Sequence, residues 1–503
     1  MDQSAQPSLP TRSFKLLALH EYRFELDPAE SISIRLVQGT AELFGFELAV
    51  GHDYPFGDEA RAAIFSWHGA DLEMSKVSTE YIAEETPVPT HLALHLALER
   101  MRLAAVAPKH FVPRVELPPS LRTLEELNED GDDERLGPRV MVVGGLSSGK
   151  STLVKTLANL AIRSGRTKVE GPGLLLGAFT LPGTFSIAPL YASIPTTTSV
   201  HPFGSTPTTG LPVLFTPANP FDAPLHPTPN PALFAPPLNA LSFYYGHADF
   251  GRNLGLVDAL FRRMGSALDA RIEKGAETAA WTGGLIVDTP GEFCDKNRGA
   301  IVKEAVRSFG INVIVVMGTE KLQLEMSKLM STNKTVRVVR VPKSSGASEF
   351  DLLYQRRLQS SQIRSYFYGG PALSQGQLSP FTIVVKFEDL MIYRVGEDAL
   401  VPSSALPIGA IRTLKSTSLL RIDPDEPRTG SLLHMVLAIP QSEWDGIDPE
   451  TDEATEAATG PVLGFVHLAG MDLVKRKYTI LSPLPGRLPR KAAIAGSLEW
   501  TDS

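Results

Sequence analysis

Apolar and polar positions alternate in short runs over the first part of the chain. Residues 31–37 and 63–67 are examples, and their period of two predicts strands with one buried face. We therefore interpret residues 1–112 as an N-terminal β-sandwich domain. The segment from Thr90 to Met101 has strong helix formers without an internal proline or glycine, which predicts a helix that leads out of this domain.

From residue 138 the pattern changes to short, wholly apolar runs that are separated by helical segments. Buried strands spaced by helices are typical of an α/β domain with a mainly parallel sheet, whose functional loops lie at the carboxyl ends of the strands. We predict such a domain over residues 138–370. Its apolar runs are 139–144, 284–287, 311–317 and 336–341, and a helix is expected over 151–164.

Two segments of unusual composition separate or interrupt these regions. Seven of the ten residues at 125–134 are acidic, and their self-repulsion predicts a solvated linker over 113–137. Twelve of the 43 residues at 195–237 are proline and only Asp222 is charged. Because proline lacks the backbone donor of helices and sheets, we predict a long irregular insertion there. The alternative for the acidic segment is a docking tail, and the alternative for the proline-rich segment is a ligand for a partner protein.

After residue 370 the β-type runs return. Runs at 381–386, 433–439 and 462–467 predict a smaller, β-rich C-terminal domain over residues 371–503. The basic runs 475–477 and 487–491 are compatible with contacts to phosphate or to an import receptor. Runs of this length are also common on solvated surfaces, so they do not decide a function.

Composition narrows the classes of function. Acidic residues outnumber basic ones by 56 to 48, so contact with nucleic acid requires a local basic patch. The single cysteine, Cys294, excludes an internal disulfide and a cysteine-based zinc site, which fits a reducing compartment. Residues 1–12 are polar, and no apolar run approaches the ~18–20 residues that span a bilayer. Export and membrane insertion are therefore not expected.

One motif carries chemistry. Gly144-Gly-Leu-Ser-Ser-Gly149-Lys150-Ser151 matches G-x-x-x-x-G-K-[ST] between a predicted strand and a predicted helix. In such a loop, backbone amides hold the phosphates of a nucleoside triphosphate, the lysine reaches the outer phosphates, and the serine hydroxyl binds Mg²⁺. A strand-to-helix turn that matches by chance is the alternative. The predicted nucleotide contacts are Gly144, Gly145, Leu146, Ser147, Ser148, Gly149, Lys150, Ser151 and Thr152, with Ser151 also binding the metal.

A second candidate is Asp288, which ends the apolar run of Leu285-Ile-Val-Asp288-Thr-Pro-Gly291. In P-loop proteins such a carboxylate holds Mg²⁺ directly or through water, whereas an aspartate that caps a turn is the alternative interpretation. Asp-x-x-Gly also occurs in GTPases. A GTPase needs a base-reading Asn-Lys-x-Asp, and the nearest segment, Asn333-Lys-Thr-Val336, ends in valine. GTP is therefore disfavoured.

Several segments together resemble a known family, and they occur in the family's order. The family is the ATP-binding subunit of eukaryotic pre-mRNA cleavage factor IA, the fungal relative of the polynucleotide 5′-hydroxyl kinases that act on RNA. The resemblance implies an α/β protein with a central P-loop NTPase domain and parallel sheet, flanked by an N-terminal β-sandwich and a C-terminal β-rich domain. The segments are 39–48, 65–69, 138–144 with the following loop, 181–184, 244–246, 288–290, 341–346 and 366–369.

The resemblance also implies that ATP is held partly by the N-terminal domain. The acid of the family's Glu-x-Arg-Phe-Glu segment corresponds to Glu21, and a basic residue before its Trp-His-Gly strand corresponds to Arg61. Taken alone, each would be interpreted as an exposed strand-edge charge. The implied cofactors are ATP and Mg²⁺, and the implied location is the nucleus. The implied partners are a large cleavage-factor scaffold subunit that contacts RNA polymerase, and RNA-binding subunits through which pre-mRNA is reached indirectly.

Two differences between this sequence and the active kinases of the family help to decide between a scaffold and an enzyme. Active members carry an aspartate at the strand end after the first helix, where it deprotonates the substrate hydroxyl. Residues 169–176 contain no aspartate, and Glu170 is the only nearby acid. Arg356 and Arg357 lie in the region of the kinases' lid arginines. We therefore expect an ATP-bound scaffold subunit without catalytic residues. An active RNA 5′-hydroxyl kinase with Glu170 or Asp288 as base is the alternative, and a P-loop GTPase is the third interpretation.

Segments 170–177 and 211–240 do not resemble the family motifs expected at their positions. Our hypothesis is that they are translated intron or follow a misplaced splice boundary. Sequencing the transcript across both segments tests this, because an mRNA that encodes them intact contradicts it.

Overall fold

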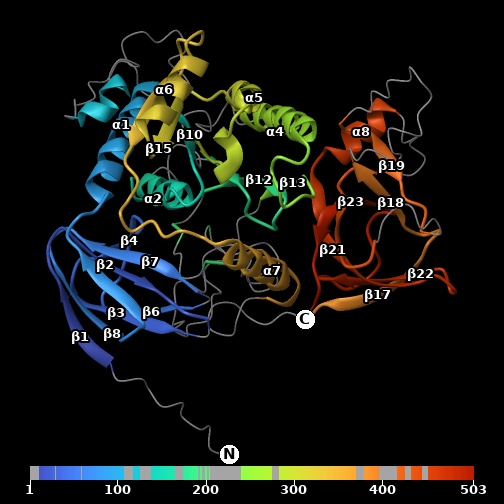
Figure 1. The fold of residues 1–503 in the computed structure, drawn as a ribbon, viewed down its shortest axis with the longest axis horizontal. Helices are drawn as coiled ribbons and strands as arrows, with labels where there is room; N and C mark the ends of the chain where they lie inside the picture. The colour runs from blue at the N-terminus through green and yellow to red at the C-terminus, as the bar shows by residue number, and fades with distance from the viewer. Residues whose placement is uncertain are drawn as a thin grey trace, which may run out of the picture.

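The structure is a computed structural model in which a two-layered β domain, a central α/β domain and a β-rich C-terminal domain follow one another along the chain (Figure 1). This confirms the predicted fold class. The structure describes residues 11–28, 30–57, 59–106, 117–124, 137–164, 174–190, 193–194, 199–200, 203, 240–274, 283–369, 379–395, 416–424, 432–443 and 451–502.

The N-terminal domain consists of two packed antiparallel sheets. Alternation produces its core: Ile32, Ile34 and Leu36 are buried, whereas the residues between them face outward. The first sheet has the order β1 (Thr11–Leu16), β8 (Ala70–Ser75), β3 (Ile32–Gly39) and β6 (Asp53–Phe56). The second has the order β5 (Phe46–Glu47), β4 (Glu42–Leu43), β7 (Arg61–Ser66), β2 (His20–Glu25) and β9 (Thr79–Ala83).

The central domain is built on a sheet whose five neighbouring parallel strands include all four predicted runs. Met141 and Val143 of the central strand pack on one face, and Val140 and Val142 pack on the other, so both faces are covered. In order, the strands are β13 (Leu241–Tyr244), β12 (Thr184–Pro189), β11 (Leu174–Gly177), β14 (Leu285–Asp288), β10 (Arg139–Gly144), β15 (Val313–Met317) and β16 (Arg337–Val341), and β12 pairs antiparallel with both β11 and β13.

Helices cover both faces of this sheet. One face packs against α1 (Val88–Val106), the short η1 (Pro119–Leu124) and α2 (Lys150–Arg163). The other packs against α4 (Leu254–Lys274) and α5 (Gly299–Phe309), with contributions from α6 (Glu320–Leu329), η7 (Gly291–Cys294) and α7 (Leu352–Tyr368). Helix α1 follows the sandwich in sequence, yet its apolar side chains belong to the core of the central domain.

The C-terminal domain contains one mixed, seven-stranded sheet that shares a core with the central domain. Tyr244 donates its hydroxyl to the carbonyl of Val436 at 2.6 Å, and the Phe367 ring stacks on Trp500. The strand order is β17 (Phe381–Lys386), β22 (Lys477–Ser482), β21 (Val462–Asp472), β20 (Met435–Pro440), β23 (Ala492–Glu499), β18 (Met391–Val395) and β19 (Leu419–Arg421), with α8 (Asp452–Ala458) beside them.

Some predictions fall on residues whose structure is not described. These are the acidic run 125–134, Glu170 and nearly all of the proline-rich segment 195–237, so the acidic part of the linker and the insertion stay predictions. The start of the predicted linker is corrected, because Leu117 and the η1 residues Leu121 and Leu124 are buried in the core of the central domain. Residues 174–177, which lack family resemblance, form β11 in the interior of the parallel sheet. Removing them would take a strand out of that sheet. Within the described residues, no helix combines the length and apolar character needed to cross a membrane.

Candidate nucleotide-binding site

The phosphate-binding loop connects the buried strand β10 to the start of α2. A Cβ atom on Gly144 would come within 2.8 Å of the Met317 carbonyl oxygen, so only glycine fits there without a shift. Gly149 has a φ of 91° and caps α2 in the left-handed conformation that glycine adopts without strain. The motif's glycines therefore shape a loop that presents the amides of the α2 N-terminus.

Lys150 lies folded over this loop. Its side chain is almost fully buried, and its Nζ donates a hydrogen bond to the carbonyl of Gly145 at 2.6 Å. Burial lowers the pKa of Lys150, while the negative charge of Asp288 opposes that shift. The ammonium group is thus held at the loop that would receive the phosphates.

Ser151 and Asp288 meet at the carboxyl edge of the sheet. The parallel register pairs Val142 of β10 with Asp288 of β14, and the Ser151 Oγ donates to Asp288 Oδ2 at 2.7 Å. Asp288 Oδ1 is buried and has no hydrogen-bond partner among the described residues. Burial raises the pKa of Asp288 to about 6, which the hydrogen bond from Ser151 and the charges of Lys150 and Lys155 partly oppose. A hydroxyl and a carboxylate oxygen in this arrangement fit the hard oxygen ligands of Mg²⁺.

The strand that follows α2 ends without an acid. This strand is β11, whose Leu176 pairs with Val287 of β14, so that Gly177 lies beside Asp288. A Cβ atom on Gly177 would be 3.4 Å from the Asp288 Cβ. Glycine therefore occupies the strand end at which the family resemblance predicts the aspartate of the active kinases, and the neighbouring strand end carries Asp288.

Glu21 is buried in the N-terminal domain, next to a residue that contacts the central domain. The local sequence alone predicts an exposed strand-edge position for Glu21, and the structure corrects this because the residue is only 3% exposed. Its Oε2 accepts from Arg23 Nε at 2.7 Å, and its Oε1 accepts from Thr86 Oγ1 at 2.6 Å. Arg23 in turn donates to Ser345 Oγ of the central domain at 3.0 Å. Glu21 thus supports a contact between the domains.

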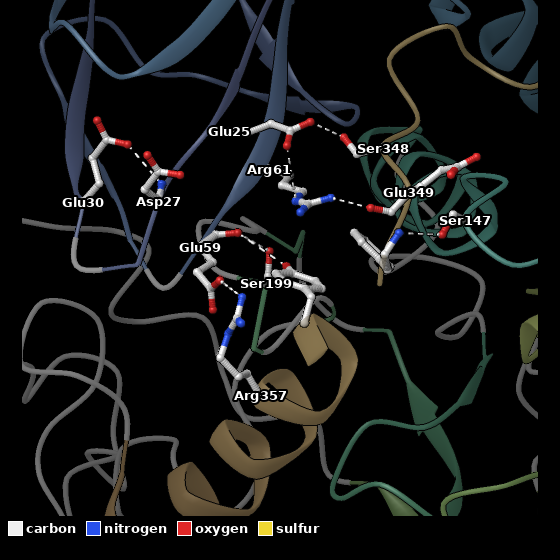
Figure 2. Close-up of polar contacts among 12 residues, drawn as sticks. Glu25, Asp27, Glu30, Glu59, Arg61, Ser147, Ser199, Ser348, Glu349 and Arg357 are labelled. Carbon is white, nitrogen blue, oxygen red and sulfur yellow. Dashed lines mark hydrogen bonds and ion pairs between the residues drawn. The ribbon is translucent and has the colours of Figure 1, made fainter. Parts of the chain in front are cut away.

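Arg61 lies on the same side of the N-terminal domain and is half-buried. Its guanidinium group is 4.4 Å from the centroid of the Tyr354 ring and 4.9 Å from that of Phe350, distances typical of cation–π contacts. Arg61 Nη1 donates to the carbonyl of Glu349 at 3.2 Å, and its Nε lies 3.6 Å from a carboxylate oxygen of Glu25 (Figure 2).

The segment 344–351 connects these N-terminal residues with the phosphate-binding loop. Ser348 Oγ donates to Glu25, and the backbone N–H of Phe350 donates to Ser147 Oγ at 3.2 Å (Figure 2). A cavity of about 340 Å³ lies between the domains, lined among others by Glu25, Arg61, Phe350 and Tyr354. Sequence analysis did not identify Phe350 or Tyr354 as site residues, because nothing in their local sequence distinguishes them from other apolar residues.

Arg357 points toward the N-terminal domain. Its guanidinium group pairs with Glu59 at 2.8 Å, as Figure 2 shows, so this arginine is directed across the cavity to another protein group. Asn333, from the segment compared with a GTPase motif, lies in the exposed turn before β16. That turn is at the amino end of a parallel strand, at the edge opposite to the phosphate-binding loop. The geometry therefore gives Asn333 no access to a nucleotide base at the loop.

Comparisons with known proteins agree with this architecture. Residues 15–105 match a family model described as the N-terminal β-sandwich domain of polyadenylation factor, residues 219–369 match the P-loop domain of the mRNA cleavage and polyadenylation factor Clp1, and residues 378–502 match the pre-mRNA cleavage complex II protein Clp1. The chain is 38% identical to the mRNA cleavage and polyadenylation factor Clp1 of Laccaria bicolor, with 96% of both chains aligned.

The chain belongs to the Clp1 family. A second relative, from Mycosarcoma maydis, is 34% identical over the full length of both chains, and the Clp1 homologue of Arabidopsis thaliana is 30% identical over 98% of this chain and 95% of its own. Among solved structures, Clp1p in its complex with Pcf11p aligns with a TM-score of 0.74 at 23% identity, covering 98% of this chain and 99% of that one. At this identity the match establishes the Clp1 fold.

Proposed function

We propose that this member of the Clp1 family is a nuclear, ATP-binding scaffold subunit required for endonucleolytic cleavage in polyadenylation-dependent pre-mRNA 3′-end formation. The names of its relatives, which are mRNA cleavage and polyadenylation factors, support the process. One observation carries the scaffold role. The phosphate-binding half of the site has its full set of side chains, whereas the strand end beside Asp288 carries Gly177 instead of a catalytic acid.

ATP would be bound by residues of both the central and the N-terminal domain. The loop from Gly144 to Thr152 would hold the phosphates, and Ser151 with Asp288 would hold Mg²⁺, which neutralises phosphate charge when bound. Glu21 and Arg61 would contribute from the N-terminal domain. Because a ligand that contacts both domains stabilises only the arrangement in which they are docked, ATP would fix one relative placement of the domains.

Without a carboxylate that could act as the catalytic base, ATP in this site would act as a structural ligand. General-base catalysis needs a group within hydrogen-bond reach of the attacking hydroxyl. Asp288 already accepts a hydrogen bond from Ser151 and would bind the metal, and Arg357 is paired with Glu59. With Asp288 as its base, the kinase alternative would have to use this carboxylate for a second purpose. Glu170, the other candidate base, lies outside the described residues. The GTPase interpretation lacks a base-reading residue at the loop.

The family also suggests which partners the docked arrangement serves. The related Clp1p has been solved in a complex with Pcf11p. We propose that this chain likewise binds the large cleavage-factor IA subunit that contacts RNA polymerase, together with RNA-binding subunits, and reaches pre-mRNA through them. Nucleotide occupancy would then influence these partner surfaces through the placement of the domains.

A single experiment separates the scaffold from the kinase. The purified protein and its Lys150→Ala variant are incubated with γ-labelled ATP and a 5′-hydroxyl RNA, and the label on the RNA is followed. We expect no transfer, with intact ATP recovered from the denatured wild-type protein and much less from Lys150→Ala. Lys303→Ala, on the exposed part of α5, is the matched control and should retain ATP.

Transfer of label that depends on Lys150 would make the protein a kinase and overturn the scaffold proposal. Equal nucleotide content in wild type and Lys150→Ala would contradict the proposed binding site itself.

A further inference from the structure

One face of α2 carries a row of polar residues that begins at the candidate metal site. Ser151, Lys155, Asn159 and Arg163 are spaced four apart, and residues with this spacing lie above one another on a helix. Ser151 bonds to Asp288, and the other three all contact the β4–β5 turn of the N-terminal domain. The row therefore runs directly from the metal ligands to the other domain.

Lys155 is the unusual member of this row. Lysine is rarely buried without a charged partner, yet this side chain is only 6% exposed. Its ammonium nitrogen lies 4.6 Å from the centroid of the Phe44 ring. Burial lowers the pKa of Lys155 to about 8, and the negative charge of Asp288 opposes this shift. The ammonium thus lies against an aromatic face, and the Asp288 carboxylate is the negative charge that acts on it.

Phe44 is held tightly in this place. It has a φ of 48°, an uncommon conformation for a residue other than glycine, and its carbonyl accepts a hydrogen bond from Asn159 Nδ2 at 2.9 Å. Arg163 Nη1 donates to Glu42 at 2.9 Å, and a Cβ atom on Gly45 would be 3.0 Å from the Thr156 carbonyl oxygen. The turn 42–47 therefore contacts α2 closely and covers Lys155 from the N-terminal side.

We infer that Lys155 is a positioning residue for the metal–nucleotide site, and that Phe44 keeps it in place. Its charge attracts and orients the Asp288 carboxylate from below the phosphate-binding loop, and the Phe44 ring prevents the ammonium from turning to solvent. Retention of a magnesium nucleoside triphosphate and docking of turn 42–47 on α2 then depend on each other. This inference rests on the proposed function, because it assumes that such a nucleotide binds at the loop.

The test uses four variants of the full chain. Lys155→Met removes the charge at similar length, Lys155→Arg keeps the charge, and Phe44→Leu removes the ring but stays apolar. Phe46→Leu is the matched control, since Phe46 lies on the same hairpin but its half-buried ring packs on Tyr54 of the sandwich. The two measurements are the ATP that each protein retains with Mg²⁺ after gel filtration, and the hydrogen-exchange protection of amides 42–47 with and without nucleotide.

We expect Lys155→Met to lower ATP retention about 10-fold and Phe44→Leu about 3-fold, in line with an order of magnitude per ~1.4 kcal/mol of lost interaction. Lys155→Arg should restore most of the retention, and Phe46→Leu should leave it unchanged. In the wild type, nucleotide should increase the protection of amides 42–47, and Lys155→Met should abolish that increase.

Normal ATP retention in both Lys155→Met and Phe44→Leu would overturn the inference while the proposed function stands. Equal losses in Lys155→Arg and Lys155→Met would also overturn it, because charge would then not be what matters. If Lys155→Met fails to fold, Phe44→Leu still decides through the protection of amides 42–47. Absence of ATP from the wild-type protein would be a failure of the proposed function, which the wild-type measurement identifies separately.

Discussion

The two ends of the proposed nucleotide site are built in different ways. The phosphate end consists of consecutive residues on one strand, loop and helix, with Asp288 supplied by the neighbouring strand. The domain-interface end consists of Glu21 and Arg61 on two adjacent strands of another domain, and of segment 344–351 between them and the loop. The first end is shaped mainly by local backbone requirements, and the second only by the docking of domains.

The difference extends to how the polar groups are satisfied. At the phosphate end Asp288 Oδ1 is buried without a partner among the described residues, as expected of a group that awaits a ligand. At the interface end, both carboxylate oxygens of Glu21 accept bonds from protein groups, and Arg61 lies against two aromatic rings. We therefore expect changes at the phosphate end to affect nucleotide binding most, and changes at the interface end to act through domain docking.

Gly144→Ala should have the largest effect. The added methyl group would come within 2.8 Å of the Met317 carbonyl oxygen, and overpacking of this kind costs about 1–3 kcal/mol. The loop should be displaced and most ATP retention lost. Thermal unfolding without nucleotide, together with nucleotide content, measures both effects. Gly145→Ala is the matched control, since nothing lies within 4 Å of its added methyl group, and equal destabilisation by both would refute the steric argument.

Asp288→Asn should come next. Asparagine keeps the shape and can still bond to Ser151, but it removes the carboxylate that Mg²⁺ prefers. We expect ATP retention with Mg²⁺ to fall about 10-fold, equivalent to ~1.4 kcal/mol, with little change when the metal is chelated. Asp295→Asn, at an exposed position, is the control. A loss of the same size with and without Mg²⁺ would show that Asp288 does not act through the metal.

Arg61→Met should have a smaller effect, at the other end of the site. It removes cation–π contacts with Tyr354 and Phe350, each worth roughly 0.5–1 kcal/mol when partly exposed, so retention of ATP should fall about 5-fold. Because the change acts on docking, exchange protection of residues 344–351 should fall as well. Arg357→Met breaks an ion pair with Glu59 and a longer cation–π contact, 6.0 Å from the Tyr354 ring centroid, and should change ATP retention less. A larger loss of ATP retention in Arg61→Met than in Asp288→Asn would reverse the ranking of the two ends.

The smallest effect concerns α1, the helix that joins the sandwich to the central core. Burial lowers the pKa of His91 from 6.5 to about 4. Between these values the unfolded chain binds the proton and the folded chain does not, so this histidine makes the protein less stable as the pH falls below about 6.5. Between pH 7.5 and pH 6, His91 lowers the free energy of unfolding by slightly less than ~1 kcal/mol.

His91→Leu should therefore reduce the acid sensitivity of the free energy of unfolding, measured by denaturant titration at pH 7.5 and 6. Only the difference between wild type and variant is compared, so that contributions of other titrating groups, including Asp288, cancel. His68→Leu, at an exposed position, should behave like the wild type. An unchanged pH dependence in His91→Leu would show that His91 is not held neutral by burial.

The phosphate end could be derived from the sequence because its requirements are local. A strand, a glycine-containing loop and a helix N-terminus are adjacent in the chain, and Asp288 ends a run whose apolar character marks it as a buried strand. The carboxyl ends of parallel strands meet at one edge, which brings Asp288 to the loop. The order of domains followed from the change between two-residue and helical periods along the chain.

The sequence by itself therefore determined the three-part architecture, the phosphate-binding loop and the lack of an aspartate after its helix. Only the tertiary structure decided that Gly177 lies beside Asp288, that Phe350 reaches Ser147 from 203 residues away, and that Phe44 covers Lys155. The physical reason is that these contacts join segments distant in the chain. Each depends on how sheets and domains pack, and no local pattern of residues encodes that packing.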